Sequence, residues 1–394
     1  MTNHALADQT DFSLARGGPL YHLYLRTKLA RPSLDLVVRR VVVVSLFCWG
    51  PPFLLALLAG QAFGNVSIPF LPDLGVHTRF LLAVPLLIAS ELIVHQRLKT
   101  VVQQFYDRGI IHLEDHPRFE AALTSTKKLR DSTFAEIVIL LISIAIGYWT
   151  WQQSVVTGAS SWYATTEGGS SRLTAAGIWY GFVSLPILRF ILLRWYYRIF
   201  IWYRFLWKVR SLPLYLNLFH PDRAGGLGFL RGSLVAFTPV LVAQTVLLAG
   251  IIGDQMWYLG KTLSSFKMEI VSVVAFLVLV VLVPLGFFLL HLARGGRRAR
   301  RELGVLASHY VREFHRKWIE GHSSDERALL GTPDIQSLAD LIDTYKAVGG
   351  MRLLPVGKEA ILRLTLVVAL PFFPLLLTMI PLDKIVDRLI KLVF

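Results

Sequence analysis

Long apolar runs constrain the fold of this chain more than any other feature of its sequence. Several runs of about 20 apolar residues are each long enough to cross a hydrocarbon layer ~30 Å thick. Of the 394 residues, 54% are hydrophobic and 17% are charged, and a soluble domain could not keep that much apolar surface out of water. The sequence therefore predicts an all-α fold, a polytopic transmembrane helical bundle with cytoplasmic helical extensions.

Hydropathy predicts about seven spans, of which the last is the least regular. Pro371 and Pro374 lie near its middle and each removes a backbone donor, so this segment either crosses with a kink or is re-entrant. Apolar residues then recur at helical spacing over 382–393, which predicts an amphipathic C-terminal helix at the membrane surface. The predicted spans are 41–60, 79–97, 134–152, 174–194, 233–252, 269–292 and 359–380.

The basic residues in the connections predict the orientation. Connections 61–78 and 153–171 contain no lysine or arginine. The basic residues gather in the N-terminal segment and in connections 98–133, 195–232 and 293–358. The positive-inside rule then places the N-terminus and the basic connections in the cytoplasm. The predicted organisation is a cytoplasmic N-terminal segment 1–40, a six-span bundle 41–292 with cytoplasmic connections 98–133 and 195–232, a basic cytoplasmic helical region 293–358, and a last transmembrane or re-entrant segment with its amphipathic helix, 359–394.

The net charge of +15 lies largely on the predicted cytoplasmic side. It favours the anionic lipid headgroups of the bilayer as a partner, at about 1 kcal/mol for each basic residue near the surface, over nucleic acid. In 194–210, arginines interleave with aromatic residues directly after a span, which predicts rings at the headgroup level and guanidinium groups on lipid phosphates. The single cysteine, Cys48, excludes an intrachain disulfide, and the sequence leaves both a monomer and a homo-oligomer open.

Four polar residues inside the predicted spans are candidates for a functional site: Glu91, His95, Arg189 and Gln244. A charge near the bilayer centre costs at least ~2.5 kcal/mol, so such residues need a partner or a role. Glu91 and His95 share one face of the second span, and we expect an ion pair between Glu91 and Arg189. Two interpretations stay open, a structural pair between helices and the lining of a proton or ion path.

The stretch LFHPDRAGGLGFLRG, residues 218–232, is polar and rich in glycine between two apolar spans. An anion or nucleotide site is one interpretation, because glycine N–H groups can close on a phosphate while Arg223 adds charge. A metal site is another, with His220 and Asp222 as ligands and a third from a later connection. The candidates for that third ligand are His309, His315 and His322.

The simplest interpretation of 218–232 is a turn that allows close backbone packing before the next helix begins. No preceding strand or complete motif supports a ligand site, so the turn is favoured. A turn also predicts that the glycines matter more than the charges of His220 and Asp222. The candidate residues of this loop are His220, Asp222, Arg223, Gly225, Gly226 and Gly228, and no catalytic residue, metal ligand or cofactor is assigned.

Helical patterns continue outside the spans. The apolar stripe of the second span runs on to Gly109. The pair His112 and His116 before Pro117 indicates a loop or a helix start, where a solvated charge cluster is favoured over a metal site. A further helix is predicted after Thr332, with an apolar stripe over 335–345. We expect this stripe to be buried against the same protein, and a separate protein partner is the alternative.

Three segments carry a resemblance to a known family. HPDRAGGLGFL, GTPDIQSLADL and the ending PLLLTMIPLDKIVDRLIKLVF together resemble a family of uncharacterised bacterial integral membrane proteins. The resemblance covers mainly 218–232 and the last third of the chain. It implies a multi-pass protein of the bacterial inner membrane and brings no known activity.

These observations favour ion or small-solute transport through a helical bundle. The alternative is a membrane scaffold or sensor that binds a partner through the basic cytoplasmic face and the loop 218–232. An embedded enzyme ranks third, because no complete catalytic set of residues can be assembled from the sequence.

Overall fold

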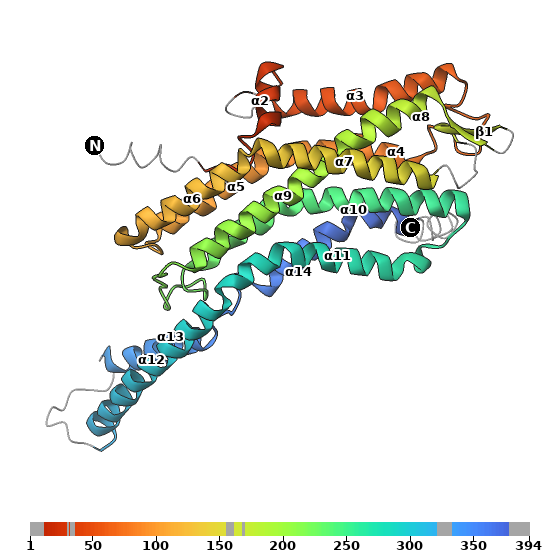
Figure 1. Ribbon diagram of the computed structural model, residues 1–394. Coiled ribbons are helices and arrows are strands. Elements are labelled where there is room, and N and C mark those ends of the chain that lie inside the picture. The colour runs from red at the N-terminus through yellow and green to blue at the C-terminus, as the bar shows by residue number, and fades with distance from the viewer. Residues whose placement is uncertain are drawn as a thin grey trace.

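A computed structural model of the chain describes residues 12–29, 31, 36–154, 161–167, 170–320 and 333–377. Within these ranges nearly all of the chain is helical, which confirms the all-α expectation. Figure 1 shows long helices running side by side in one bundle, with a helical hairpin projecting from one end. Six helices are long and apolar enough to cross a membrane, or seven if one bent pair counts as a span, and this is compatible with a multi-pass membrane protein.

The elements follow one another in a simple order. In the first half of the chain the α-helices are α2 (Pro19–Arg26), α3 (Val37–Leu58), α4 (Leu74–His77), α5 (Val84–Asp107), α6 (His116–Arg130), α7 (Thr133–Ser154), α8 (Ala175–Trp179) and α9 (Leu185–Arg210). In the second half they are α10 (Arg231–Leu259), α11 (Lys267–Leu282), α12 (Leu289–Trp318), α13 (Pro333–Gly349), α14 (Lys358–Ala369) and α15 (Phe373–Leu377). Short 3₁₀ turns are η2 (Leu113–Asp115), η5 (Leu227–Leu230), η6 (Leu263–Phe266), η7 (Val283–Phe288) and η8 (Leu370–Phe372).

The two ends of the bundle differ in character. One end carries α2, α6 and the projecting α12 and α13, and we call it the basic end (Figure 1). The opposite end carries a small antiparallel sheet, β1 (Ala164–Glu167) paired with β2 (Ser170–Leu173). We call it the hairpin end after this β-hairpin; the helical hairpin of α12 and α13 belongs to the basic end. The sequence did not predict these strands, which lie in the connection 153–171 and just after it, where β2 includes Arg172.

Two of the long helices are built alike. Asp73 and Thr174 cap the short helices α4 and α8 by accepting a hydrogen bond from the backbone three residues later. Each short helix continues into a π-helical segment, η1 (Thr78–Ala83) or η4 (Tyr180–Ser184), and then into α5 or α9. Pro85 and Pro186 stand at the second position of α5 and α9. The widened turns are therefore at matching levels near the hairpin end, and such turns frequently mark functional sites.

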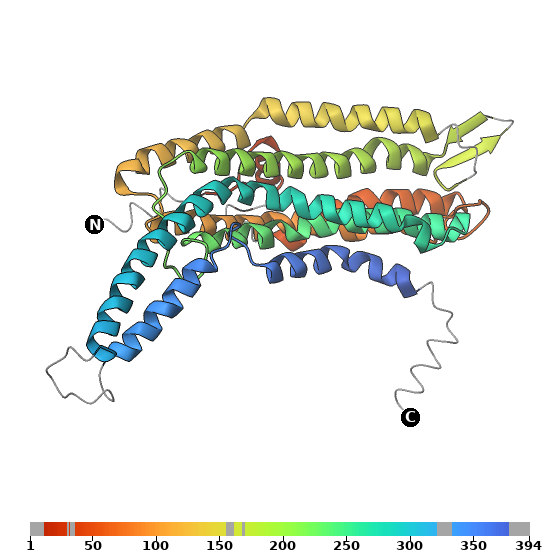
Figure 2. The same ribbon diagram turned by 90° about the horizontal axis from the view of Figure 1, so that it is seen from below.

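The structure bears on two predicted segments, the extension of the second span and the last span. The second predicted span does extend as α5 to Asp107, and Gly109, with φ 61°, follows its end. The region over 358–377 is one rod interrupted at its prolines by η8, and Figure 2 shows it following the bundle rather than turning back. The described residues thus give no support to the re-entrant alternative. The predicted amphipathic helix over 382–393 lies outside the described residues.

The hairpin of α12 and α13 is less covered than the sequence predicted. Ala299, Leu303 and Val348 form a small buried contact between its two helices. Ile342 and Tyr345, in the apolar stripe of α13, are 44% and 42% exposed. The expectation that the same protein buries this stripe is therefore wrong for these residues, because the hairpin leaves the bundle at an angle and α12 covers another part of α13 (Figure 2). The expected cap at Thr332 lies outside the described residues.

Candidate functional site

Glu91 is the centre of a buried charge cluster at the basic end. Its Oε2 accepts a hydrogen bond from Arg40 Nη1 of α3 at 2.6 Å. Its Oε1 accepts from Arg198 Nη2 at 2.9 Å and lies 3.3 Å from Arg194 Nη1, both on α9. Glu91, Arg40, Arg194 and Arg198 are at most 7% exposed. One carboxylate therefore holds three guanidinium groups away from solvent.

A second carboxylate completes this cluster. Glu136, near the start of α7, accepts a hydrogen bond from Arg194 Nε at 2.9 Å through its Oε1. Its Oε2 accepts from the backbone N–H of Leu20 at 2.9 Å. We call Glu91, Glu136, Arg40, Arg194 and Arg198 the charge cluster. With two carboxylates and three guanidinium groups, it carries one positive charge in excess.

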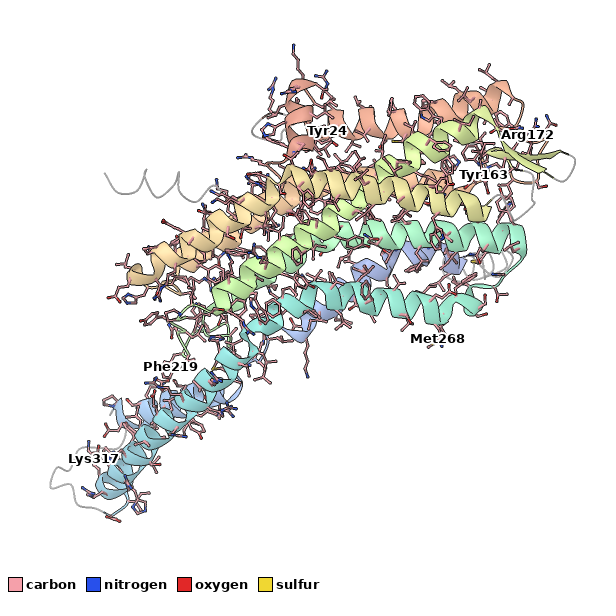
Figure 3. All side chains as sticks on the ribbon, viewed as in Figure 1. Tyr24, Tyr163, Arg172, Phe219, Met268 and Lys317 are labelled. Atoms are coloured by element: carbon pink, nitrogen blue, oxygen red, sulfur yellow. The ribbon has the colours of Figure 1, made fainter. Side chains whose placement is uncertain are left out.

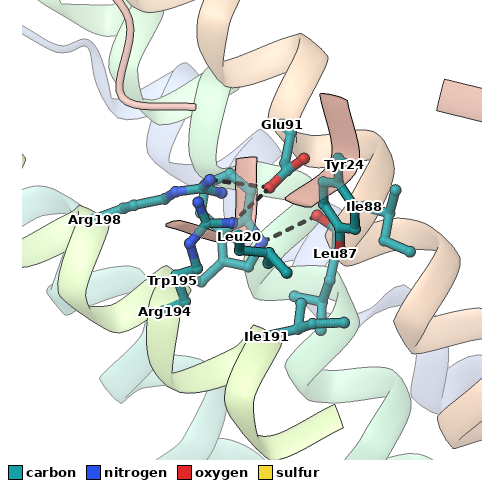
Figure 4. Close-up of a pocket in the computed structure, with 9 residues that line it drawn as sticks. All are labelled: Leu20, Tyr24, Leu87, Ile88, Glu91, Ile191, Arg194, Trp195 and Arg198. Carbon is teal, nitrogen blue, oxygen red and sulfur yellow. Dashed lines mark hydrogen bonds and ion pairs between the residues drawn. The ribbon is translucent and has the colours of Figure 1, made fainter. Parts of the chain in front are cut away.

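The N-terminal segment, Phe12–Leu20, covers the charge cluster. Arg194 Nη2 donates to the carbonyl oxygen of Gly17 at 3.1 Å, and Arg198 Nη2 donates to that of Ala15 at 3.4 Å. Beneath the segment lies a cavity of about 10 Å³, enough for about one water molecule. Figure 4 shows Glu91, Arg194 and Arg198 converging on it, with Tyr24 and apolar side chains around them.

Tyr24 on α2 adds a neutral donor above the charge cluster. Burial, with Glu91 nearby, raises the pKa of its hydroxyl to about 12. Its ring also lies under the Arg40 guanidinium, with the Arg40 Cζ 5.5 Å from the ring centroid. Tyr24 therefore stays protonated and stabilises a buried cation.

The structure corrects two expectations about the basic residues. Glu91 pairs with Arg40, Arg194 and Arg198, so the predicted pair with Arg189 is wrong. Arg189 instead faces α7, since a Cβ added at Gly147 would lie 2.9 Å from its Nη1. Arg194 and Arg198 were also expected on lipid phosphates, yet they face the interior of the bundle. Helical position decides this, because α9 turns these two arginines toward α5.

Sequence reasoning identified only one of the five residues in the charge cluster. Glu136 stands in an apolar run, so the rule that selected Glu91 would also have selected it. Arg40, Arg194 and Arg198 stand at predicted span ends, where a snorkelling arginine has the same pattern. Their burial depends on contacts with residues more than fifty positions away.

A second polar cluster lies at the hairpin end. Asp73 accepts a hydrogen bond from the indole N–H of the buried Trp162 at 2.8 Å. Asp254 of α10 accepts from the backbone N–H of Gly75 at 2.9 Å. Arg79 of η1 donates to the hydroxyl of Tyr180 in η4, so the two π-helical segments touch through their side chains. We call Asp73, Arg79, Trp162, Tyr180 and Asp254 the hairpin-end cluster; the sequence analysis proposed none of its residues.

Buried apolar residues separate the two clusters. Arg79 and Glu91 lie about 18 Å apart along the helix axis at 1.5 Å per residue. Between them on the same helix, Phe80, Ala83, Val84 and Leu87 are all 0% exposed. The Trp195 indole N–H of α9 also donates to the carbonyl oxygen of Leu87 at 3.0 Å. On this face of the helix a layer of buried apolar side chains, which we call the dry layer, therefore lies between the two clusters.

The other two intramembrane candidates lie near the charge cluster or deeper in the bundle. His95 is 6% exposed, one turn after Glu91 on α5. Gln244 of α10 lies beside Tyr196 of α9. Both are inside the bundle as expected, and Glu91 has the larger set of ionic partners.

Asp222 organises the loop 218–232. Its Oδ1 accepts hydrogen bonds from the backbone N–H groups of Ala224 at 2.8 Å and Gly226 at 3.2 Å, and its Oδ2 accepts from Gly228 at 2.8 Å. The N–H groups that could cradle a phosphate are thus occupied by the chain's own carboxylate. The geometry supports the turn over the anion or nucleotide site.

Asp222 therefore has a larger role than the sequence analysis expected. Burial alone would raise the pKa of its carboxyl, but the backbone hydrogen bonds and His220 together hold this pKa below its usual value. Arg108, the residue after α5, reinforces the loop by donating to the carbonyl oxygen of Gly226 at 3.0 Å. The charge of Asp222 is part of what closes the turn.

Backbone conformation explains the remaining loop residues. Gly225 and Gly226 have φ values of 62° and 90°, a region that favours glycine. Gly228 is needed for space, because a Cβ there would lie 2.8 Å from Asp222 Oδ2. Arg223, with φ 54°, accepts a hydrogen bond through its carbonyl oxygen from Arg352 N at 2.8 Å. The loop thus joins the bundle to the chain after α13.

The histidine motifs form no metal site in the part of the chain that the structure describes, where no group of three or more His, Cys, Asp or Glu residues could hold a metal ion. His220 Nδ1 lies 3.1 Å from Asp222 Oδ1. His315 of α12 lies with its Nδ1 3.2 Å from Oε1 of Glu320, which follows that helix. His322 lies outside the described residues. His116 begins α6, which confirms the predicted helix start.

Comparisons of this chain with family models, curated proteins and solved structures found no match. Its function is therefore argued from its own residues.

Proposed function

We propose that the chain is a multi-pass protein of the bacterial inner membrane, with its N-terminus in the cytoplasm, that passes an ion or small solute through its bundle. The observation that carries this proposal is the pair of buried polar clusters, one built on η1 and η4 and the other on the interiors of α5 and α9. Charged groups in a bilayer are costly and usually mark pathways or binding sites. Two such clusters with a dry layer between them fit a closed pathway.

The π-helical segments add support from the backbone. Non-helical or widened backbone inside a membrane is tolerated where it is buried in protein or lines a cavity. Here η1 and η4 supply Arg79 and Tyr180 to the hairpin-end cluster. Local changes at these turns can move a side chain without unfolding a whole span.

Flux from reconstituted vesicles tests this proposal. Wild-type protein is expected to release small ions or solutes from loaded vesicles, and Glu91→Gln is expected to alter the rate. Arg172→Gln, at an exposed position of β2, is a control that replaces no residue of either cluster. Folded protein that passes no member of a panel of cations, anions and small neutral solutes would contradict the proposal.

A scaffold or sensor is the second candidate, because α12 and α13 expose apolar side chains. Val305, Leu306 and Val311 of α12 are 50% to 61% exposed. Basic residues on α12 could also lie on anionic lipid headgroups. Crosslinking from this hairpin to one defined partner, with no flux in vesicles, would favour this function over transport.

A further inference from the structure

The covered charge cluster has more donors than its carboxylates can satisfy. Its two carboxylates face three guanidinium groups, and each guanidinium carries five N–H donors. Nε and Nη2 of Arg40, a side chain that is 0% exposed, have no hydrogen-bond partner among the described residues. A buried positive excess with unused donors is a site prepared for an anion.

The N-terminal segment supplies weak substitutes for that anion. The carbonyl oxygens of Ala15 and Gly17 take donors from Arg198 and Arg194 at 3.4 and 3.1 Å. Hydrogen bonds from guanidinium to a carboxylate are shorter, about 2.7–2.9 Å, and they also bring the opposite charge that a backbone carbonyl lacks. A ligand carboxylate would therefore satisfy these donors better than the backbone does.

The cavity lining indicates the kind of anion. Apart from Leu20, which belongs to the N-terminal segment, its apolar lining is Leu87, Ile88 and Ile191, and its charged lining is Glu91, Arg194 and Arg198. A planar carboxylate matches the fork of an arginine, and a short aliphatic chain would lie against the apolar side. A single excess positive charge matches a monovalent ligand, and a cation would be repelled.

We propose that the charge cluster binds a small aliphatic monocarboxylate and that the N-terminal segment is a plug that competes with it. The present cavity holds about one water, so the plug must leave for the ligand to enter. Within the proposed transport function, on which this part rests, the monocarboxylate is the solute that passes through the bundle.

The backbone of the plug offers a way to loosen it without replacing an arginine of the charge cluster. Gly17 and Gly18 have φ values of 145° and 85°. A Cβ at Gly17 would collide with the Asp131 carboxylate, and one at Gly18 would lie 2.5 Å from Glu136 Oε1. Gly17→Ala and Gly18→Ala should both unseat the segment. Gly64→Ala, where nothing lies within 4 Å, is the matched control.

Calorimetric titration of the full chain in lipid nanodiscs with butyrate tests the proposal, with chloride and butylammonium as controls. The glycine variants are expected to bind butyrate about tenfold more tightly than wild type or Gly64→Ala, because the open state becomes more populated. Arg198→Gln in the loosened background should abolish binding, and Arg198→Lys should retain part of it. Should the glycine variants misfold, Phe12→Ala replaces them, since it removes the aromatic contact with Phe205 that anchors the plug.

The outcomes separate the two proposals. Butyrate binding that is enhanced by loosening, without flux, supports the site and contradicts transport. Flux of other solutes, with no butyrate binding by any folded variant, contradicts the site alone. Equal responses to butyrate and chloride would overturn the assignment of a carboxylate ligand.

Discussion

Glu91 binds the arginines of two different helices, so replacing it should lower the stability of the contacts that α5 makes with both of them. Glu91→Gln leaves buried guanidinium groups without their carboxylate, and breaking a buried pair in this way costs about 3–5 kcal/mol. Because Arg40 is the nearest of the three, Arg40→Gln added to Glu91→Gln should recover part of the loss. Thermal unfolding in detergent of both single variants and the double variant measures this coupling.

Arg189 is the matched control for that cycle, since it faces α7 and not Glu91. The effects of Arg189→Gln and Glu91→Gln should simply add. Equal coupling of Glu91 to Arg189 and to Arg40 would contradict the observed cluster.

Asp222 makes the loop 218–232 sensitive to acid. Its pKa is lowered in the folded chain, so it contributes stability that is present above its unfolded pKa of about 4 and is lost as the pH falls through the folded value. Asp222→Asn should weaken the loop near neutral pH and remove this acid dependence. Hydrogen exchange of Ala224, Gly226 and Gly228 from pH 7 down to pH 3 measures it, and unchanged exchange in the variant would show that the carboxylate is dispensable.

At the scale of the element, the helices were more predictable from the sequence than their contacts. Apolar periodicity located the spans and the end of α5 before Gly109, because burial in a bundle imposes the same pattern everywhere. It could not locate the N-terminal segment, whose contacts with Arg130 and Arg194 join residues more than a hundred positions apart. Hydrogen bonds of that range leave no local pattern in the sequence.

The short helix α8 depends on one close backbone contact. A Cβ at Gly177 would collide with the carbonyl oxygen of Tyr163, whereas nothing lies within 4 Å of a Cβ at Gly181. Gly177→Ala should therefore lower the melting temperature by several degrees, and Gly181→Ala should change it little. A matching decrease in both variants, read from thermal unfolding, would point to helix flexibility in place of this contact.

At the scale of the whole molecule, the sidedness of the bundle follows from charge. Figure 3 shows Arg172 at the hairpin end and Phe219 near the basic end. In a Cys48→Ser background, Arg172→Cys should react with a maleimide that reaches the periplasm but does not cross the inner membrane, and Phe219→Cys should react only after that membrane is opened. Labelling of both positions from the same side would overturn the predicted orientation.

The site was only partly predictable at this scale. Glu91 stood out because a carboxylate in an apolar run has a large desolvation cost. Arg198 did not, because an arginine at a span end can face either lipid or protein. Asp222 was misjudged because its three backbone partners depend on how the turn closes.

The break η7 between α11 and α12 gives the projecting hairpin a mechanical consequence. Because α12 is continuous over its 30 residues, it is a rigid arm about 45 Å long at 1.5 Å per residue. A rotation of about 10° at η7 would carry its tip through about 8 Å, a geometric estimate from that length. The load of a protein or lipid surface on that tip would therefore act on the interior of the bundle with the leverage of the whole arm.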